Sequence, residues 1–388
     1  MTTEEHQSTA AKPLRLQSLR VRNFKAIVDS KVVKLGPLTV FIGNNGAGKS
    51  SLVEALETYQ AIVRDGLDSA MQRWLGIEHV RHKAQEAKER LGKPLNPIRF
   101  ELAIGSSARK VRRLEMSVNN DPAANMMFIA EERYTADDDD WQERDLVGAA
   151  ATYGTSRSIL SGVIGESMAE ARQVLAWQFL TLSPERMGMP VPQQRTAGRV
   201  RLARDGSNVA DVLLDLRRES LSAFEGLVET MAYVLPYARD IQPSITSEIE
   251  RKAWLQLTEA GFKVPGWMLS TGTLRMLALL ALLRHPEPPP LIVVEEIENG
   301  LDPRSVHLIV EEIRTAVMSG STQVVLTTHS PYLLDLLTLE HLIVVERDAL
   351  GHAQFTRPAD QAGLQRWATD FAPGKLYTMG NLTGLAKA

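Results

Sequence analysis

One stretch of eight residues constrains this chain more than any other. It reads Gly43-Asn44-Asn45-Gly46-Ala47-Gly48-Lys49-Ser50 and lies between an apolar run, residues 38–42, and a run with helical character that starts at Ser51. The order strand, glycine loop, helix, with the spacing G-x-x-x-x-G-K-[ST], is typical of a phosphate-binding P-loop. Glycines let successive backbone N–H groups point at one anion, and the helix N-terminus adds positive charge. The sequence therefore predicts a site for a nucleoside triphosphate.

The side chains of this loop have separate expected roles. Lys49 is expected to reach the β- and γ-phosphates, and the Ser50 hydroxyl to take one position around Mg²⁺. The other expected nucleotide-binding residues supply the backbone cradle and the start of the helix: Gly43, Asn44, Asn45, Gly46, Ala47, Gly48 and Ser51.

Composition and charge narrow the class of protein. The 388 residues allow two domains or one domain with a large insertion, and a net charge of −3 does not indicate a nucleic-acid binder. The absence of cysteine excludes disulfides, thiolate metal sites and cysteine nucleophiles, and it fits a reducing cytoplasm. No window approaches the ~18 apolar residues of a membrane span, so no membrane association is expected. Residues 1–13 are polar, and we expect a flexible tail there.

Hydrophobic periodicity predicts an α/β chain. Strands are expected at residues 14–23, 32–35 and 38–42, and an antiparallel meander at residues 98–104, 110–118 and 126–134. From residue 158 to about 257 helical periodicity dominates, with helices at residues 165–180, 208–218 and 221–233, and Asn208 is a candidate cap. Beyond residue 267, strands at 291–294, 323–327 and 342–346 alternate with helices at 271–283, 303–318 and 331–336. This alternation predicts a parallel sheet that is covered on both faces.

A second motif, at residues 291–298, is an apolar strand that ends in acids. This is the Walker B arrangement, in which one carboxylate supports the metal and the next faces a water near the γ-phosphate. We expect Glu295 to support Mg²⁺ and Glu296 to act as the general base.

A third motif is the turn that carries Ser270 and Gly272 at the start of a predicted helix. A hydroxyl, a glycine N–H and a helix N-terminus make a second anion site. One nucleotide needs two such sites only if two subunits meet head to tail, each offering this turn to the γ-phosphate of the other. Asp302 lies in the turn after the acids, and His329 ends a buried strand, where ligands of parallel sheets bind. We expect His329 to contact the γ-phosphate.

These motifs resemble the ABC-type ATPase head of the SMC, RecF and OLD-like proteins, in particular the standalone bacterial AAA-family ATPases of the OLD/RecF-like branch. The motifs that carry the resemblance are residues 43–51, 269–275, 291–296, 299–303 and 327–330. The similarity extends from residues 19–25 to residues 374–380 and includes the sequence Asp205-Gly-Ser-Asn208.

The resemblance implies a P-loop ABC-type head with a mixed sheet, the antiparallel meander and an inserted, mostly helical lobe. Residues 14–150 and 266–388 would form the ATPase lobe, and residues 151–265 the insertion. It also implies ATP and Mg²⁺ as cofactors and ATP-dependent dimerisation, or a higher oligomer, with two nucleotides at the interface. Ser270 and Gly272 would be the signature contact, Asp302 the D-loop and His329 the switch histidine.

The sequence departs from the family pattern at several places. Glu295 stands where aspartate is usual, which puts its metal contact or the rate of turnover in question, and the signature reads Ser-Thr-Gly-Thr. Gln85, His79 and His82 remain alternatives for the Q-loop ligand. No TOPRIM-like nuclease domain follows the sheet, so nuclease activity is not expected.

Three hypotheses remain for function. The first is an ATPase whose cycle controls a partner, either DNA or a nuclease or toxin encoded elsewhere, as in anti-phage defence. The second is an ATP-sensing scaffold with negligible hydrolysis. The third is a RecF-like DNA-repair clamp that would use Arg109, Arg112 and Arg113 as a basic strand.

Overall fold

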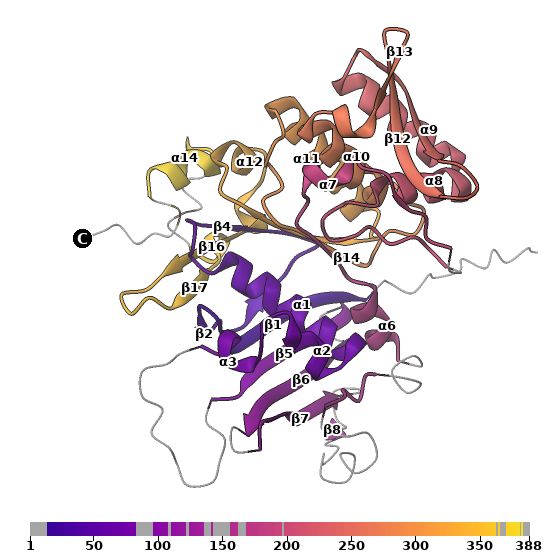
Figure 1. Ribbon diagram of the computed structural model, residues 1–388. Helices are drawn as coiled ribbons and strands as arrows, with labels where there is room; N and C mark the ends of the chain where they lie inside the picture. Colours follow the sequence, from indigo (N-terminus) through magenta and orange to yellow (C-terminus); the bar gives the residue numbers. More distant parts are fainter. Residues whose placement is uncertain are drawn as a thin grey trace, which may run out of the picture.

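The computed structural model describes residues 14–82, 96–107, 110–121, 124–135, 141–142, 156–161, 168–195, 198–361, 364, 370–380 and 382. In this part of the chain, three sheets and their helices stack in layers (Figure 1). The middle layer is a six-stranded sheet with the order β17-β16-β4-β15-β14-β9. Its strands are β4 (Leu38–Ile42), β9 (Gln178–Leu180), β14 (Leu291–Val294), β15 (Gln323–Thr328), β16 (Leu342–Arg347) and β17 (Ala353–Thr356). All pairs are parallel except β16 with β17, so the mixed sheet that we expected is confirmed.

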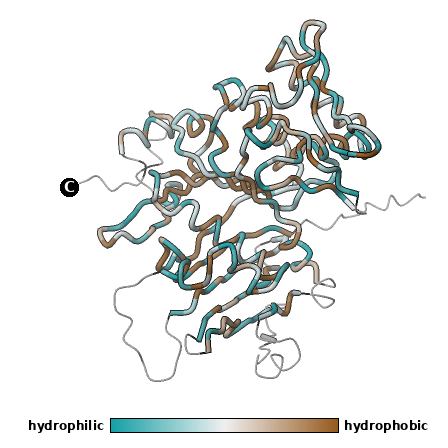
Figure 2. The backbone as a smooth tube through the Cα atoms, in the orientation of Figure 1, coloured by the Kyte–Doolittle hydropathy of each residue, from teal (hydrophilic) through white to brown (hydrophobic). Residues whose placement is uncertain are grey.

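The two faces of the middle sheet belong to two hydrophobic cores. Successive strand residues point to opposite faces, so Val40 and Ile42 pack into one core and Phe41 into the other. The same alternation holds in β14, where Ile292 and Leu291 lie on opposite sides. Figure 2 shows the apolar residues concentrated along these strands. The uninterrupted apolar character of the strands follows from burial on both faces.

One face is covered by helices and by an antiparallel sheet with the order β2-β1-β5-β6-β7-β8, in which β3 pairs with β1. The sheet comprises β1 (Arg15–Phe24), β2 (Ile27–Asp29), β3 (Val33–Lys34), β5 (Ile98–Ser107), β6 (Lys110–Asp121), β7 (Met126–Thr135) and β8 (Trp141–Gln142). The helices on this side are α1 (Lys49–Asp65), α2 (Leu67–Gln72), α3 (Ile77–Val80) and α6 (Ala169–Ala176). The expected β5-β6-β7 meander is confirmed.

The other face is covered mainly by helices, with a small sheet at the far end (Figure 1). The helices are α7 (Pro184–Met187), α8 (Val209–Glu219), α9 (Leu221–Val234), α10 (Thr271–Leu283), α11 (Pro303–Met318), α12 (Pro331–Asp335) and α14 (Pro373–Thr378). The small sheet consists of β10 (Val191–Pro192), β11 (Ala238–Ile245), β12 (Lys252–Glu259) and β13 (Phe262–Pro265).

Within residues 158–257 the helical prediction is right for α6, α8 and α9 and wrong for β9, β11 and β12. In β12, Ala253, Leu255 and Leu257 alternate with partly exposed residues, a period-two signal that the surrounding helical pattern outweighed. The strand β9 has only three residues, and its pairing with β14 decides its conformation. Asn208 occupies the N-cap position of α8, but its side chain accepts a hydrogen bond from Ala203 N–H instead of capping the helix. The boundaries of the inserted lobe, at residues 151 and 265, stay a prediction.

None of the helices in the described ranges is long and apolar enough to cross a membrane.

We expect Glu132 to make the stability of the fold depend on pH. This carboxyl on β7 is 3% exposed and accepts hydrogen bonds from the Ser158 hydroxyl and the Ile159 N–H. Burial raises its pKa from 4.5 to about 7. The folded protein therefore binds this proton more tightly than the unfolded chain, and the stability contributed below pH 4.5 is lost as the pH rises to 7.

The expected loss is on the order of 2–3 kcal/mol in the free energy of unfolding. Urea denaturation of the wild type and of Glu132→Gln at several pH values measures it. The substituted protein should show a flatter pH dependence over this range, and equal slopes for the two proteins would refute the prediction.

Candidate functional site

The middle sheet brings three sequence motifs to one edge. The strand β15 pairs in parallel with β4 on one side and with β14 on the other. The P-loop follows β4, the acids follow β14 and His329 follows β15, so all three motifs emerge where parallel strands end.

The P-loop backbone fits a polyphosphate. Gly48 lies at the N-cap of α1 with φ of 119°, and Gly46 has φ of 76°, both in the region that favours glycine. A Cβ atom at Gly43 would lie 2.1 Å from the Val345 carbonyl oxygen, and one at Gly48 would lie 2.7 Å from the Ala353 Cβ. Larger residues would therefore push the loop away from the sheet, and the glycines keep the anion cradle against β16 and β17.

The ammonium group of Lys49 lies beneath this loop. Lys49 is 6% exposed and donates hydrogen bonds to the carbonyl oxygens of Gly43 (2.6 Å) and Asn44 (3.2 Å). Burial lowers its pKa, and the carboxylates of Glu296 and Glu298 oppose that shift. The cation therefore faces both the loop and the acids that follow β14. Ser50 is exposed in the first turn of α1.

The first Walker B acid, Glu295, is held by neighbours from two elements. Its backbone N–H donates to the Leu180 carbonyl, which extends the pairing of β14 with β9. Its side chain is 12% exposed, and Oε1 accepts hydrogen bonds from the Thr181 hydroxyl (3.0 Å) and from Arg204 (3.2 Å). The sequence did not indicate Thr181 or Arg204 as neighbours of this acid.

The second acid, Glu296, has a strained backbone. Its φ of 49° is left-handed, which is unfavourable for a residue with a Cβ atom. The Glu296 N–H donates to the Thr327 hydroxyl at 3.0 Å, and the carbonyl accepts from Arg275 at 3.5 Å. Asn299 donates to its carboxylate. Strain that surrounding bonds maintain is common at functional sites, and here it fixes the direction of an exposed carboxylate.

A third acid, Glu298, joins the site although the sequence analysis gave it no role. Its Oε1 accepts the His329 N–H at 2.9 Å and lies 3.4 Å from Nδ1 of the same histidine. Its Oε2 is buried and has no hydrogen-bond partner among the described residues. The signal was present in the sequence Glu-Glu-Ile-Glu, whose last acid returns towards the end of β15.

The signature turn and the D-loop form one cluster on the opposite side of the middle sheet from α1 (Figure 1). Ser270 caps α10 by accepting a hydrogen bond from the Thr273 N–H, and a Cβ atom at Gly272 would lie 2.6 Å from the Gly300 carbonyl. Asp302 caps α11 and also accepts the Ser305 hydroxyl at 2.6 Å. Arg275 connects this cluster to the Glu296 carbonyl.

Two further residues touch the P-loop without having been predicted. Arg347, at the end of β16, donates to the Gly46 carbonyl at 2.8 Å. Tyr377, on α14, donates to the Asn44 side chain at 3.3 Å. Both come from the last quarter of the chain, so the P-loop is supported from elements distant in sequence.

The donor set fits a magnesium–nucleotide complex. A hydroxyl from Ser50 and a carboxylate from Glu295 are hard oxygen ligands, and Mg²⁺ usually combines few carboxylates with phosphate oxygens. Within the described ranges no group of three or more acidic or histidine side chains is arranged to hold a metal by itself. The ion would therefore be shared between the chain and the phosphates.

The candidates for the Q-loop ligand and for the basic strand are not placed at the P-loop by any described contact. Gln85 and Arg109 lie outside the described residues. His82 makes a 2.6 Å contact from Nδ1 to the Lys25 carbonyl, while His79 is exposed. Arg112 donates to the Tyr134 hydroxyl (2.7 Å) and pairs with Glu170, so much of its hydrogen-bonding capacity is used within the chain.

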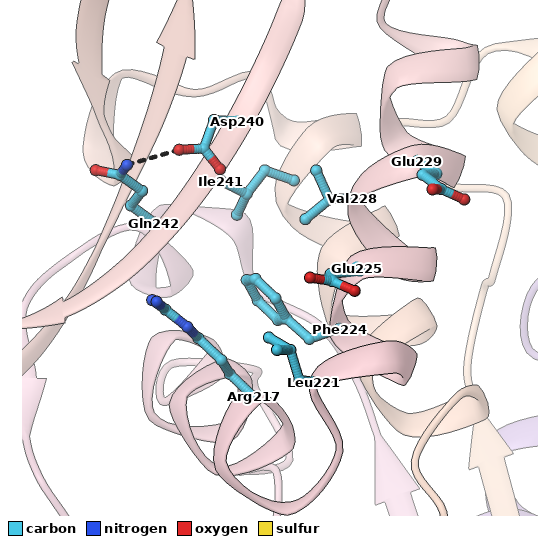
Figure 3. Close-up of a pocket in the computed structure, with 9 residues that line it drawn as sticks. All are labelled: Arg217, Leu221, Phe224, Glu225, Val228, Glu229, Asp240, Ile241 and Gln242. Carbon is cyan, nitrogen blue, oxygen red and sulfur yellow. Dashed lines mark hydrogen bonds between the residues drawn. The ribbon is translucent and has the colours of Figure 1, made fainter.

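A hollow of about 380 Å³ lies between α8, α9 and β11 (Figure 3). Phe224, Val228 and Ile241 form its apolar part, and Asp240 accepts a hydrogen bond from Gln242 at 2.6 Å. Its described lining contains none of the predicted nucleotide-binding residues. We therefore place the candidate site at the P-loop and not in this hollow.

Comparisons with known proteins agree with this geometry. Residues 15–119 match a family model described as an AAA ATPase domain, and residues 193–335 match one described as "AAA domain, putative AbiEii toxin, Type IV TA system". The Nod factor export ATP-binding protein I of Sinorhizobium fredii is 33% identical over 37% of this chain and 38% of the relative. Its counterpart from Bradyrhizobium diazoefficiens is 29% identical over 48% of this chain and 61% of the relative. The chain thus spans less than two thirds of these relatives.

Solved structures define the fold. A crystal structure of the SmcHead bound to the C-winged helix domain of ScpA superposes with a TM-score of 0.57 at 12% identity, and covers 88% of this chain and 97% of that chain. An Smc head domain with an extended coiled coil, bound to the C-terminal domain of ScpA and derived from Pyrococcus furiosus, gives 0.55 at 12% identity. It covers 92% of this chain and 100% of that chain.

The chain therefore has the fold of an SMC head, with a P-loop at the ends of its parallel strands. More particularly, two separate segments of the chain are similar to AAA ATPase domains, and the fold as a whole is similar to that of SMC heads.

The cap formed by Asp302 gives a prediction that separates the hydrogen bonds of its side chain from the effect of its charge. Loss of the N-cap in Asp302→Ala should lower the free energy of unfolding by about 1 kcal/mol. Asp302→Asn should keep most of that stability, because asparagine is an equally good cap. Urea denaturation measures both. Equal destabilisation by the two substitutions would show that the charge, and not the cap, stabilises α11.

Proposed function

We propose that this chain is a Mg²⁺-dependent ATPase that binds and hydrolyses ATP at a head-to-tail interface between two copies. The open–closed cycle would control a partner. The observation that carries this proposal is the position of Lys49, Glu295 and Glu296 beyond the ends of β4 and β14, the two strands that flank β15, around a glycine cradle that fits phosphates.

Each group then has a role in hydrolysis. The P-loop N–H groups and Lys49 would hold the phosphates, and Ser50 and Glu295 would hold a magnesium ion, which would offset phosphate charge. Glu296 orients a water and accepts its proton as the oxygen attacks the γ-phosphorus and ADP leaves. His329, fixed by Glu298, contacts the γ-phosphate from the end of β15.

A second copy would complete the site. Ser270 is exposed at the N-terminus of α10, where the helix end favours an anion. Gly272 packs against Gly300, so the signature turn and the D-loop move as one surface. Arg275 ties that surface to Glu296. Contact of this turn with a γ-phosphate held by the partner copy would therefore act directly on the position of Glu296, the proposed general base.

The biological role is proposed from what the relatives are. One matched family model is described as a putative AbiEii toxin of a type IV toxin–antitoxin system, and the SMC heads are bound to ScpA. We propose that this chain acts in the cytoplasm on a separate effector, a nuclease or toxin, in anti-phage defence of the OLD-like kind. DNA is the alternative partner.

The chemistry is tested at Glu296 and Lys49. Glu296→Gln should lower phosphate release by about 10²-fold or more, because a general base contributes that much, and should retain ATP through gel filtration. Lys49→Ala should lose both phosphate release and the retention of ATP. Glu229→Gln, an exposed acid on α9, is the matched control and should behave as wild type. If the Glu296→Gln protein neither accumulates ATP nor loses turnover, the base is assigned wrongly.

The dimer is tested by mixing two inactive proteins. Lys49→Ala removes the phosphate contact and Ser270→Arg blocks the signature, so a mixed dimer carries one intact composite site and one doubly defective site. Recovery should reach about one quarter of the wild-type rate of phosphate release if subunits exchange freely. Lys49→Ala mixed with the doubly substituted protein is the control and should stay inactive. A mixture of the two single variants that stays inactive would exclude sites shared between copies.

A second candidate function is an ATP sensor with negligible hydrolysis. The observation that favours it is the ion pair between Glu295 and Arg204, which occupies the acid expected to support Mg²⁺. Steady-state phosphate release by the wild-type protein distinguishes the two functions.

A further inference from the structure

The turn Asp205-Gly206-Ser207-Asn208 has no part in the chemistry above, yet it is tightly built. Asp205 accepts the Ser207 N–H at 3.0 Å. Asn208 accepts the Ala203 N–H at 2.7 Å and donates to the Arg201 carbonyl at 2.8 Å. These bonds brace both sides of Arg204, so the turn fixes the position of that residue.

The same segment docks beside the Walker B strand. The Thr181 N–H donates to the Arg204 carbonyl and the Ser183 N–H donates to the Asp205 carbonyl, each at 2.9 Å. Thr181 directly follows β9, whose last residue, Leu180, pairs with Val294 of β14. Thr181 therefore lies beside Glu295, and the backbone of Arg204 lies on the far side of Thr181.

The guanidinium of Arg204 bridges two carboxylates. It lies 2.9 Å from Oε2 of Glu57 on α1 and 3.2 Å from Oε1 of Glu295 after β14. It also donates to the Thr181 hydroxyl at 3.2 Å. The Arg204 side chain is 33% exposed, and the two acids are 15% and 12% exposed. A planar guanidinium suits this bridging geometry better than an ammonium group does.

Glu57 has a second cation, whereas the described contacts of the Glu295 side chain include only one. Arg73 lies 2.6 Å from Glu57, and burial raises the pKa of Glu57, with the charge of Glu295 contributing to the rise. The two acids are therefore close enough to repel each other, and Arg204 is the positive charge placed between them.

We infer that Arg204 is a positioning residue that holds Glu295 and competes with Mg²⁺ for it, so that this arginine sets the metal requirement of nucleotide binding. The inference rests on the proposed function of Glu295 as a metal ligand. Arg204 fixes Oε1 of a side chain longer than the usual aspartate, and its charge opposes a divalent cation at the same carboxylate. Glu57 draws the guanidinium away from Glu295 and so favours the metal.

This arrangement also links the metal site to the rest of the chain. The turn that braces Arg204 leads directly into α8, which packs against α9, α10 and the small sheet.

The test is the MgCl₂ concentration that half-saturates thermal stabilisation of the protein by AMP-PNP, a non-hydrolysable ATP analogue. Arg204→Gln should lower this concentration by about threefold to tenfold, because one positive charge near the metal is removed. The metal-free protein should also melt at a lower temperature, because Glu57 and Glu295 lose their shared cation. Arg204→Lys keeps the charge and should restore a requirement close to wild type.

Glu57→Gln should change the MgCl₂ requirement in the opposite direction. Arg204 then has Glu295 as its remaining carboxylate partner in this cluster, and the MgCl₂ requirement should rise. A purely structural role for Arg204 predicts lower melting temperatures with an unchanged requirement in both variants, and that result overturns the inference, as does a higher requirement in Arg204→Gln.

Glu295→Gln separates the inference from the proposed function. If this substitution raises the MgCl₂ requirement while Arg204→Gln and Glu57→Gln leave it unchanged, the role of Arg204 is refuted and the metal role of Glu295 stands. If Glu295→Gln itself leaves the requirement unchanged, the metal assignment fails, and the role of Arg204 fails with it.

Discussion

The parallel pairing of β15 with β4 and with β14 sets where every group of the candidate site lies. Strand ends in register at one edge bring together a loop, an acid pair and a histidine that are separated by almost three hundred residues of chain. Burial on both faces stabilises this register, because a slip by one residue would exchange the two cores that receive Val40 and Phe41. The geometry of the site thus depends on the packing of the sheet.

The strained loop after β14 connects the two sides of the sheet. Glu296 has a left-handed backbone, which Thr327 and Arg275 hold from β15 and from α10. The contact between Gly272 and Gly300 joins the signature turn to the same loop. Because a bond from Arg275 on α10 helps to maintain this strain, a displacement of that helix would reach the Glu296 carboxylate over a short path.

The side chain of Glu295 is held in place by its neighbours. A longer acid is less constrained than an aspartate, and here Thr181 and Arg204 supply the constraint by binding Oε1. The motif around residue 205 braces that arginine. The longer acid at position 295 is therefore held in place by contacts from the segment around residue 205.

The sequence alone determined the local elements: the P-loop and its helix, the apolar strand before Glu295, the β5-β6-β7 meander and the helices α8 to α11. These elements depend on glycine placement and hydrophobic periodicity, and both signals come from residues that are close together in the sequence. Only the tertiary structure decided that β9 is a strand and that Arg204, Glu298, Arg347 and Tyr377 reach the site. The physical reason is range, because strand pairing and side-chain hydrogen bonds between distant residues leave no periodic signal in the segments that make them.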